Sequence, residues 1–280
     1  MPRSIVAMTI AHLSDLHFGR IADTGIVDAL VAEINDRADD LVVLSGDLTQ
    51  RARHREFEAA QAMLRRLEPS TLAVPGNHDV YPWWRPVRRL ATPLRRYKRY
   101  VTGDLAPTHA ADGVAVLGIS TAYGATIKGG RVGPGDRRAI RDYFEDVSDA
   151  AFRILVLHHH LTEVRSIGPH DVARQARRTL DTAAEQGVHL ILCGHLHVSH
   201  VEPLKVIPGA QRMVVASAGT ATSNRWRPSF RPTNVYNIVT VTEDAFQIEE
   251  RRYRSDEARF VPERRTRFDR TPPPMPDEAG

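Results

Sequence analysis

The stretch VPGNHDV, residues 74–80, sets an amide, an imidazole and a carboxylate side by side directly after an apolar run and a Pro-Gly turn. Pro, Gly and Asn are ordinary turn residues, so the stretch taken alone is a strand that ends in a polar loop. The alternative is that the turn holds an oxygen ligand and a proton donor at the edge of a sheet. That alternative gains weight only if similar clusters recur elsewhere in the chain.

Similar clusters do recur, each after a short apolar run. The runs that we predict to be strands are residues 5–13, 41–44, 71–74, 154–157 and 190–192. The polar groups that follow them are Asp15-Leu16-His17, Gly46-Asp47, Asn77-His78-Asp79, His158-His159-His160 and Gly194-His195-Leu196-His197. In open sheets that alternate with helices, ligands bind outside the carboxyl ends of the strands. We therefore expect the five clusters to converge at one edge.

The side chains in these clusters have the chemistry of a metal site. They offer carboxylates, imidazoles and a carboxamide oxygen but no thiolate, a donor set that suits Zn, Mn or Fe. Two acids, one amide and at least four histidines exceed the needs of one ion, which indicates two ions that share a bridging carboxylate. An ordinary surface loop explains any one cluster, but five of them at successive strand ends favour a site.

In this order, over residues 15–197, the clusters resemble the five motifs of the calcineurin-like metallophosphoesterases. They look most like the bacterial branch that hydrolyses cyclic nucleotides and glycerophosphodiesters. The resemblance implies an α/β fold, a four-layer αββα sandwich of two mixed sheets flanked by helices. It also implies a dinuclear phosphoesterase in which a hydroxide shared by two metal ions (Mn, Fe or Zn) attacks phosphorus. Small phosphodiesters, with 3′,5′-cyclic nucleotides among them, are then the expected substrates.

The resemblance further implies which residues hold the two ions. The first ion is expected on Asp15, His17, Asp47 and His197. The second is expected on Asp47, Asn77, His195 and either His158 or His159. We favour His158 because it is the first residue beyond the strand. Asp47 would bridge the two ions.

Two further residues are expected to act on the substrate rather than on the ions. His78 would stabilise or protonate the leaving oxygen, and Asp79 would orient its imidazole. Thr49 stands where purple acid phosphatases carry the tyrosine that binds ferric iron, which argues against a purple iron site.

Other functions fit the same motifs. A nuclease, a phosphomonoesterase or a lipid-linked phosphoesterase would use the same ions, and a non-catalytic metal-binding scaffold is an alternative of another class. Every motif position is filled, which favours an enzyme. The segment from Tyr81 to Tyr100 bears on the partner because it is rich in arginine and aromatic residues and has no acidic residue. It predicts a nucleic acid or another phosphate-bearing partner, with a solvated helix as the alternative.

Length and composition indicate the number of domains, the cellular location and the absence of a membrane span. A chain of 280 residues with 42% hydrophobic residues and a net charge of +4 can bury a full core. We expect one domain over residues 1–260 and a proline-rich tail over residues 261–280. The single cysteine, Cys193, excludes an internal disulfide framework and favours a reducing, cytoplasmic location. No stretch is long enough to span a bilayer, and residues 5–11 resemble a strand rather than a signal peptide. The oligomeric state is left open.

The later third of the chain changes its pattern. Residues 213–216, 235–241 and 246–248 are predicted strands without intervening helices, which indicates antiparallel pairing. Residues 207–210 (IPGA) are predicted to turn a hairpin.

Overall fold

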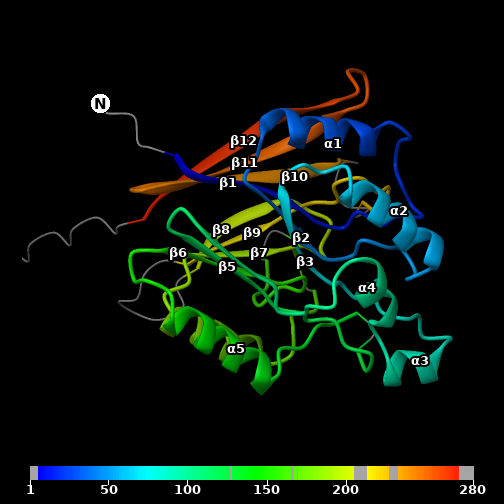
Figure 1. Cartoon of the computed structure of the whole chain (residues 1–280), viewed down its shortest axis with the longest axis horizontal. Helices are drawn as coiled ribbons and strands as arrows, with labels where there is room; N and C mark the ends of the chain where they lie inside the picture. The colour runs from blue at the N-terminus through cyan, green and yellow to red at the C-terminus, as the bar shows by residue number, and fades with distance from the viewer. Residues whose placement is uncertain are drawn as a thin grey trace, which may run out of the picture.

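Two six-stranded β-sheets pack face to face in the computed structural model, with helices on their outer faces (Figure 1). The structure describes residues 6–126, 128–164, 167–168, 170–204, 213–226 and 233–270. In the view of Figure 1, α1 lies above the first sheet and α5 lies below the second. The four-layer αββα sandwich expected from the sequence is confirmed.

The first sheet has the strand order β12-β11-β10-β1-β2-β3. Its strands are β1 (Val6–Leu13), β2 (Leu41–Ser45), β3 (Ser70–Val74), β10 (Val235–Thr242), β11 (Ala245–Arg254) and β12 (Arg259–Asp269). Strands β1, β2 and β3 run parallel, and α1 (Ile26–Arg37) and α2 (His54–Leu64) supply the crossovers that parallel neighbours need. Strand β10 joins β1 in the antiparallel sense and continues through β11 to β12.

The second sheet has the order β4-β5-β6-β7-β9-β8. Its strands are β4 (Thr108–Ala111), β5 (Val114–Gly118), β6 (Phe152–Val156), β7 (Leu190–Cys193), β8 (His200–Leu204) and β9 (Met213–Ser217). The four central strands are parallel, and β4 and β8 are antiparallel edges. Helices α5 (Pro134–Glu145) and α6 (Ala176–Glu185) connect β5 to β6 and β6 to β7. Helices α3 (Pro86–Ala91) and α4 (Arg95–Tyr100) lie in the connection from the first sheet to the second.

One apolar core fills the space between the two sheets. Ile10 and Val43 of the first sheet meet Ile154 and Leu192 of the second, and all four are fully buried. Two further apolar clusters lie between each sheet and its covering helices. Because the central parallel strands are covered on both faces, their sequences are continuous apolar runs rather than alternating ones.

Several predictions from the sequence differ from the structure. Strands β4 and β8 are short and mix polar with apolar residues, so neither contains the apolar run by which we predicted strands. The domain boundary expected after residue 260 falls inside β12, whose residues 259–269 pair with β11. The arginines that make this segment look like a surface tail are paired with carboxylates of β11, for example Arg265 with Glu249. A charged edge strand is also a common protection against sheet-to-sheet aggregation.

Two other predictions concern residues outside the described ranges. The hairpin turn predicted at residues 207–210 and the end of the tail, residues 271–280, are not among the residues that the structure describes. Strands β8 and β9, which flank the predicted hairpin turn, pair in the antiparallel sense. Within the described ranges, no helix is both long enough and apolar enough to cross a bilayer.

The shared core predicts a specific stability difference. Replacing Ile154 with Ala removes a fully buried side chain from between the two sheets. We expect this variant to lose about 2–5 kcal/mol of unfolding free energy, measured by urea denaturation. Val87→Ala is the control because Val87 is 77% exposed, and it should change stability by no more than about 0.5 kcal/mol. Equal urea midpoints for the two variants would contradict a core shared by both sheets.

Candidate metal centre

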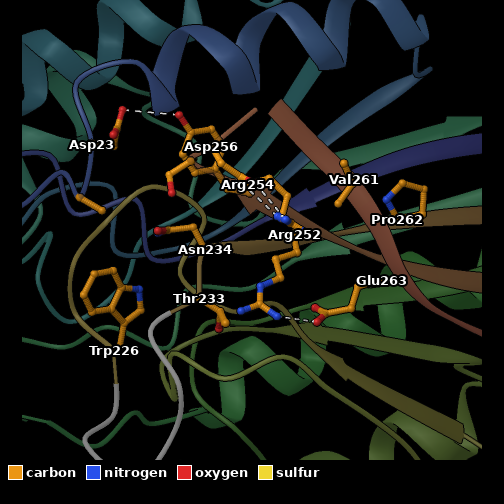
Figure 2. Close-up of a pocket in the computed structure, with 13 residues that line it drawn as sticks. Asp23, Trp226, Thr233, Asn234, Arg252, Arg254, Asp256, Val261, Pro262 and Glu263 are labelled. Atoms are coloured by element: carbon orange, nitrogen blue, oxygen red, sulfur yellow. Dashed lines mark hydrogen bonds and ion pairs between the residues drawn. The ribbon is translucent and has the colours of Figure 1, made fainter. Parts of the chain in front are cut away.

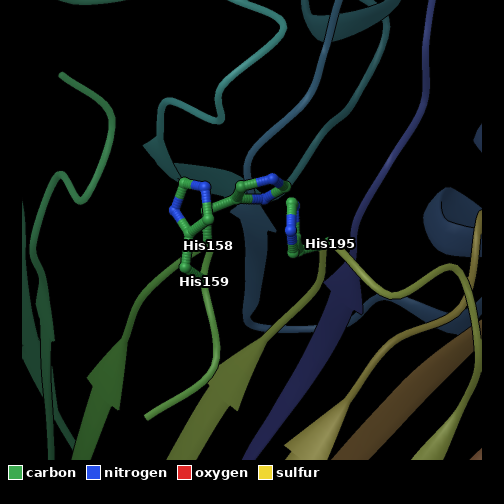
Figure 3. Close-up of side chains that lie close together, drawn as sticks. All are labelled: His158, His159 and His195. Carbon is green, nitrogen blue, oxygen red and sulfur yellow. The ribbon is translucent and has the colours of Figure 1, made fainter. Parts of the chain in front are cut away.

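The five polar clusters meet where the parallel strands of both sheets end. The possible ligand atoms of Asp15, His17, Asp47 and His197 lie within 4.8 Å of one another. Those of His158, His159 and His195 form a second group within the same distance. Figure 3 shows these three imidazoles gathered above the ends of their strands. The convergence expected from the strand-end pattern is therefore present in the structure.

In the first group, one acid and two histidines face a common point. Asp15 Oδ1 lies 3.1 Å from His197 Nε2 and 3.5 Å from His17 Nε2. The two Nε2 atoms of His17 and His197 are themselves 3.1 Å apart. His17 Nε2 lies 3.7 Å from Asp47 Oδ2. The four side chains thus direct their oxygen and nitrogen atoms into one buried space.

His158, a member of the second group, lies close to both Asp47 and Asn77. His158 Nε2 lies 3.4 Å from Asp47 Oδ2 and 3.3 Å from Asn77 Oδ1. His195 stands beside them, with its ring centroid 5.2 Å from that of His158. Asp47 Oδ2 is therefore within 3.7 Å of a histidine of each group, the position that a bridging carboxylate needs.

The hydrogen bonds of the two adjacent histidines distinguish them. His158 donates from Nδ1 to the Ser45 carbonyl at 2.7 Å, so its Nε2 is directed at Asp47 and Asn77. His159 donates from Nε2 to the Lys128 carbonyl at 3.0 Å, and its Nδ1 is 2.7 Å from the Thr121 hydroxyl. Both ring nitrogens of His159 are thus engaged away from Asp47. This geometry favours His158 over His159 as the ligand.

The backbone of the strand-end loops is unusual. Asp15, His17, Asp47, His195 and His197 have φ angles of 52°, 47°, 55°, 71° and 57°, in the left-handed region that residues other than glycine rarely adopt. Such conformations cost on the order of 1–3 kcal/mol each and cluster at functional sites. Backbone hydrogen bonds between the loops hold them in place, including the Asp15 amide on the Gly46 carbonyl at 3.1 Å.

Two glycines make room for the acids. A Cβ atom at Gly76 would lie 2.1 Å from Asp47 Oδ1, and one at Gly194 would lie 1.7 Å from Ser14 Oγ and 2.7 Å from Asp15 Oδ2. Any side chain at either position would displace the carboxylate that it faces. Gly76 and Gly194 are therefore required because the site has no space for a side chain at either position.

The electrostatics of the site favour cations. Burial raises the pKa of Asp47, but the neighbouring charges of His158 and His78 outweigh it and hold that pKa well below its usual range. Burial works against a charged His158, yet the Asp47 carboxylate raises the pKa of that imidazole to about 9. Burial lowers the pKa of His195 to about 3, so His195 is a neutral imidazole with a free lone pair near neutral pH. A positive charge beside Asp47 is therefore strongly favoured.

These observations fit two metal ions. The donors are oxygen and nitrogen atoms of acids, an amide and imidazoles, which suits Mn, Fe or Zn. Asp15 Oδ1 is buried and accepts no hydrogen bond from any described residue, as expected of an oxygen placed for a cation. The structure thus supports a dinuclear site without distinguishing between the metals.

His78 lies at the rim of this arrangement. Its ring is 4.9 Å from that of His17, and its backbone amide donates to Asp47 Oδ1 at 2.8 Å. The imidazole donates from Nδ1 to the Gln50 carbonyl at 2.7 Å, and Arg225 Nη1 lies 2.9 Å from Nε2. His78 is therefore attached to the site through its backbone and faces it with its ring.

Asp79 has a different role from the one expected. Its carboxylate accepts hydrogen bonds from the Thr49 amide and hydroxyl, both at 2.9 Å, and from the Gly76 amide at 3.0 Å. Among the described residues, Gln50 and Arg225 hold the His78 ring, and Asp79 does not. Asp79 instead joins the loops that flank Asp47. Burial and the charge of Asp47 raise its pKa to about 7.

Arg225 was not anticipated from the sequence. It follows β9, which is parallel to β7 and ends at the same edge. Its guanidinium contacts His78 and lies 3.2 Å from Gln50 Oε1, and its carbonyl accepts a hydrogen bond from His197 Nδ1. The strand-end argument applied to β9 would have pointed to this loop, but Arg225 lies eight positions after Ser217, the last residue of β9, which weakens that signal.

The glycine contacts predict how the site can be disrupted without touching a ligand. We expect Gly76→Ala to push Asp47 aside, because the new Cβ would also lie 2.4 Å from the Asp47 amide nitrogen. The variant should retain less Mn per chain after dialysis, measured by elemental analysis, and lose about 1–3 kcal/mol of stability.

Gly135→Ala in α5 is the matched control for this variant. A Cβ there meets no described atom within 4 Å, and alanine suits a helix better than glycine. Unchanged Mn content in Gly76→Ala would show that metal binding does not depend on the close approach of Gly76 to Asp47.

The chain is similar in sequence to proteins of a known family. The sequence model of the calcineurin-like phosphoesterases matches residues 8–199. The glycerophosphodiester phosphodiesterase GpdQ of Enterobacter lignolyticus (strain SCF1) is 34% identical over 82 residues, which cover 26% of this chain and 30% of GpdQ. An uncharacterized metallophosphoesterase of Helicobacter pylori (strain ATCC 700392 / 26695) is 31% identical over 85 residues, 29% of this chain and 22% of that protein. The matches thus span less than a third of either relative.

This chain has the same fold as several solved structures. The structure of PhoD has a TM-score of 0.71 and 13% sequence identity, and the match covers 95% of this chain and 70% of PhoD. The purple acid phosphatase PPD1 from yellow lupin (Lupinus luteus) seeds has a TM-score of 0.68 and 12% identity, and covers 95% of this chain and 54% of its own. At such identities the likeness establishes the fold alone. Together with the family match over residues 8–199, it shows that this chain belongs to the calcineurin-like phosphoesterases.

Proposed function

We propose that the protein is a dinuclear metal-dependent phosphodiesterase that hydrolyses small phosphodiesters, with 3′,5′-cyclic nucleotides as candidates. The observation that carries the proposal is the position of the Asp47 carboxylate between the two groups of ligand atoms. The preference for diesters is supported by the partial match to a glycerophosphodiester phosphodiesterase. Family membership alone supports the coarser statement, a metal-dependent phosphoester hydrolase.

The ligands are proposed as the sequence predicts them. One ion is held by Asp15, His17, Asp47 and His197. The other is held by Asp47, Asn77, His158 and His195. Two ions bound there would lower the pKa of water and neutralise charge on the phosphoryl oxygens.

The chain's own residues at the rim act on the substrate. The Gln50 carbonyl fixes the Nδ1 proton of His78 and leaves Nε2 facing the site. Arg225 keeps its charge at any working pH and lies against Nε2. We assign Arg225 to the negative charge that develops on the phosphoryl group. We assign His78 to stabilising or protonating the leaving oxygen, a role that it performs as the imidazolium, with a second proton on Nε2 directed at the substrate in place of the contact with Arg225. Asp79 positions the loops around Asp47 through its hydrogen bonds to Thr49 and Gly76.

The proposed reaction is tested with two chromogenic substrates. With added Mn, wild type should hydrolyse bis(4-nitrophenyl) phosphate with a higher kcat/KM than 4-nitrophenyl phosphate. Removing a group that only supports a metal ligand lowers activity roughly 10–100-fold. Asp47→Asn should lower kcat/KM for the diester by more than this, because it weakens the binding of both ions. Asp142→Asn, on the exposed face of α5, is the control and should match wild type.

Each outcome of this assay has a distinct meaning. A higher kcat/KM for the monoester than for the diester would mean that the protein is a phosphomonoesterase rather than a phosphodiesterase. Full activity in Asp47→Asn would contradict the dinuclear site itself.

Arg225 gives a second test that separates substrate binding from metal binding. We expect Arg225→Gln to lower kcat/KM for the diester by roughly 10²–10³, as loss of one donor to a developing oxyanion does. Arg225→Lys should recover part of this loss because it restores the charge but not the planar fork. Mn content should stay at the wild-type level in both variants, since no ligand atom is removed. Wild-type kcat/KM in Arg225→Gln would remove this residue from the reaction.

A further inference from the structure

An apolar patch lies on the turn before α3 and on α3 itself. The described residues contain four exposed large hydrophobic side chains, and all four lie within eight positions of one another. They are Trp83, Trp84, Val87 and Leu90, with exposed fractions of 68%, 44%, 77% and 67%. Scattered exposed hydrophobic residues are ordinary on a protein surface, but a gathering of this kind marks an interaction site.

The patch is held firmly in its outward orientation. Arg89, on the opposite side of α3, is buried and donates hydrogen bonds to the carbonyls of Tyr81, Gly124 and Thr126. Leu94 and Tyr97, which follow α3, are buried in the core beneath the first sheet. Because the buried contacts of Arg89, Leu94 and Tyr97 fix the orientation of the segment, Val87 and Leu90 cannot turn inward and remain exposed in the folded protein.

The charge around the patch is positive and uncompensated. Its basic side chains are Arg85, Arg88, Arg95, Lys98 and Arg99, all of them exposed. None of them forms an ion pair with a described carboxylate. The arginines of β12 behave differently, since Arg264 pairs with Glu250 and Arg265 with Glu249. The positive charge beside the patch is therefore available to an anionic partner.

We propose that residues 83–99 dock the protein on the surface of an anionic phospholipid membrane. Tryptophan and aliphatic side chains insert at the boundary between headgroups and acyl chains, while arginine and lysine bind the anionic headgroups. Val87 and Leu90 favour lipid over nucleic acid, because aliphatic side chains do not stack on bases as aromatic ones do. A second copy of the chain is disfavoured, since a two-fold contact would oppose the same unpaired charges.

The position of the patch links docking to the metal centre. The Trp84 ring lies 5.2 Å from the guanidinium of Arg51, the residue that follows Gln50. The Gln50 carbonyl holds the His78 imidazole. The docked surface would therefore lie beside the rim of the metal centre.

Sedimentation with vesicles tests the docking. The full chain is mixed with vesicles of phosphatidylcholine alone or of phosphatidylcholine with phosphatidylglycerol, and binding to single-stranded DNA is measured at the same salt. We expect binding to the anionic vesicles with a blue shift of tryptophan fluorescence, since two of the three tryptophans are in the patch. Binding to the neutral vesicles and to DNA should be much weaker.

Paired variants separate the apolar and charged contributions. Arg88→Gln with Arg95→Gln should weaken vesicle binding roughly thirty-fold, given about a fivefold effect for each charge. Val87→Ser with Leu90→Ser should abolish the blue shift and most of the binding while the charge stays the same. The control, Arg138→Gln with Arg178→Gln, removes two exposed arginines of α5 and α6 and should bind as wild type does.

Three results would overturn the proposal. The first is no binding to anionic vesicles by wild type. The second is equal binding by wild type and the Val87/Leu90 variant, which would mean adsorption by charge alone. The third is tighter binding to single-stranded DNA than to vesicles, lost in the Arg88/Arg95 variant, which would make the segment a nucleic acid surface. All of these substitutions are at exposed positions, and thermal unfolding confirms that each variant folds.

Discussion

The buried carboxylate of Asp47 is the constraint on which the rest of the site depends. A carboxylate that is only 1% exposed is strongly destabilising unless positive charge or hydrogen bonds surround it. The chain meets this need with the His78 amide and with the imidazoles of His17 and His158. The same arrangement places Asp47 Oδ2 within 3.7 Å of His17 Nε2 and 3.4 Å of His158 Nε2. The strained loop backbone and the glycine at position 76 are consequences of bringing these groups so close together.

The site also explains why two sheets are needed. Asp47 and Asn77 follow strands of the first sheet, whereas His158 and His195 follow strands of the second. Neither sheet alone carries all of the residues that we propose as ligands of the second ion. The apolar core between the sheets therefore fixes the distance across which Asp47 and His158 face each other. The geometry of the site therefore depends on the packing of this core.

Much of this could be predicted from the sequence, because a buried parallel strand is a continuous apolar run and a ligand at its end follows within a few residues. That reasoning predicted that Asp15, Asp47 and His195 lie at strand ends and converge, and the structure brings them into the two groups of possible ligand atoms. The reasoning favoured His158 over His159 only from its place after the strand, since the hydrogen bonds to Ser45 and Thr121 that distinguish the two rings come from distant segments. It could not find Arg225 or the actual contacts of Asp79, which depend on how the loops fold back. Strand β12 escaped prediction because its sequence is charged and lacks an apolar run, whereas the strand forms by pairing with β11 along its length.

The most direct test of the central claim is a crystal structure of the protein with Mn bound, located by anomalous scattering. The account predicts two peaks separated by about 3.5–4 Å, with the Asp47 carboxylate between them and His158 rather than His159 beside the second. A single peak, or two peaks that do not share Asp47, would contradict it.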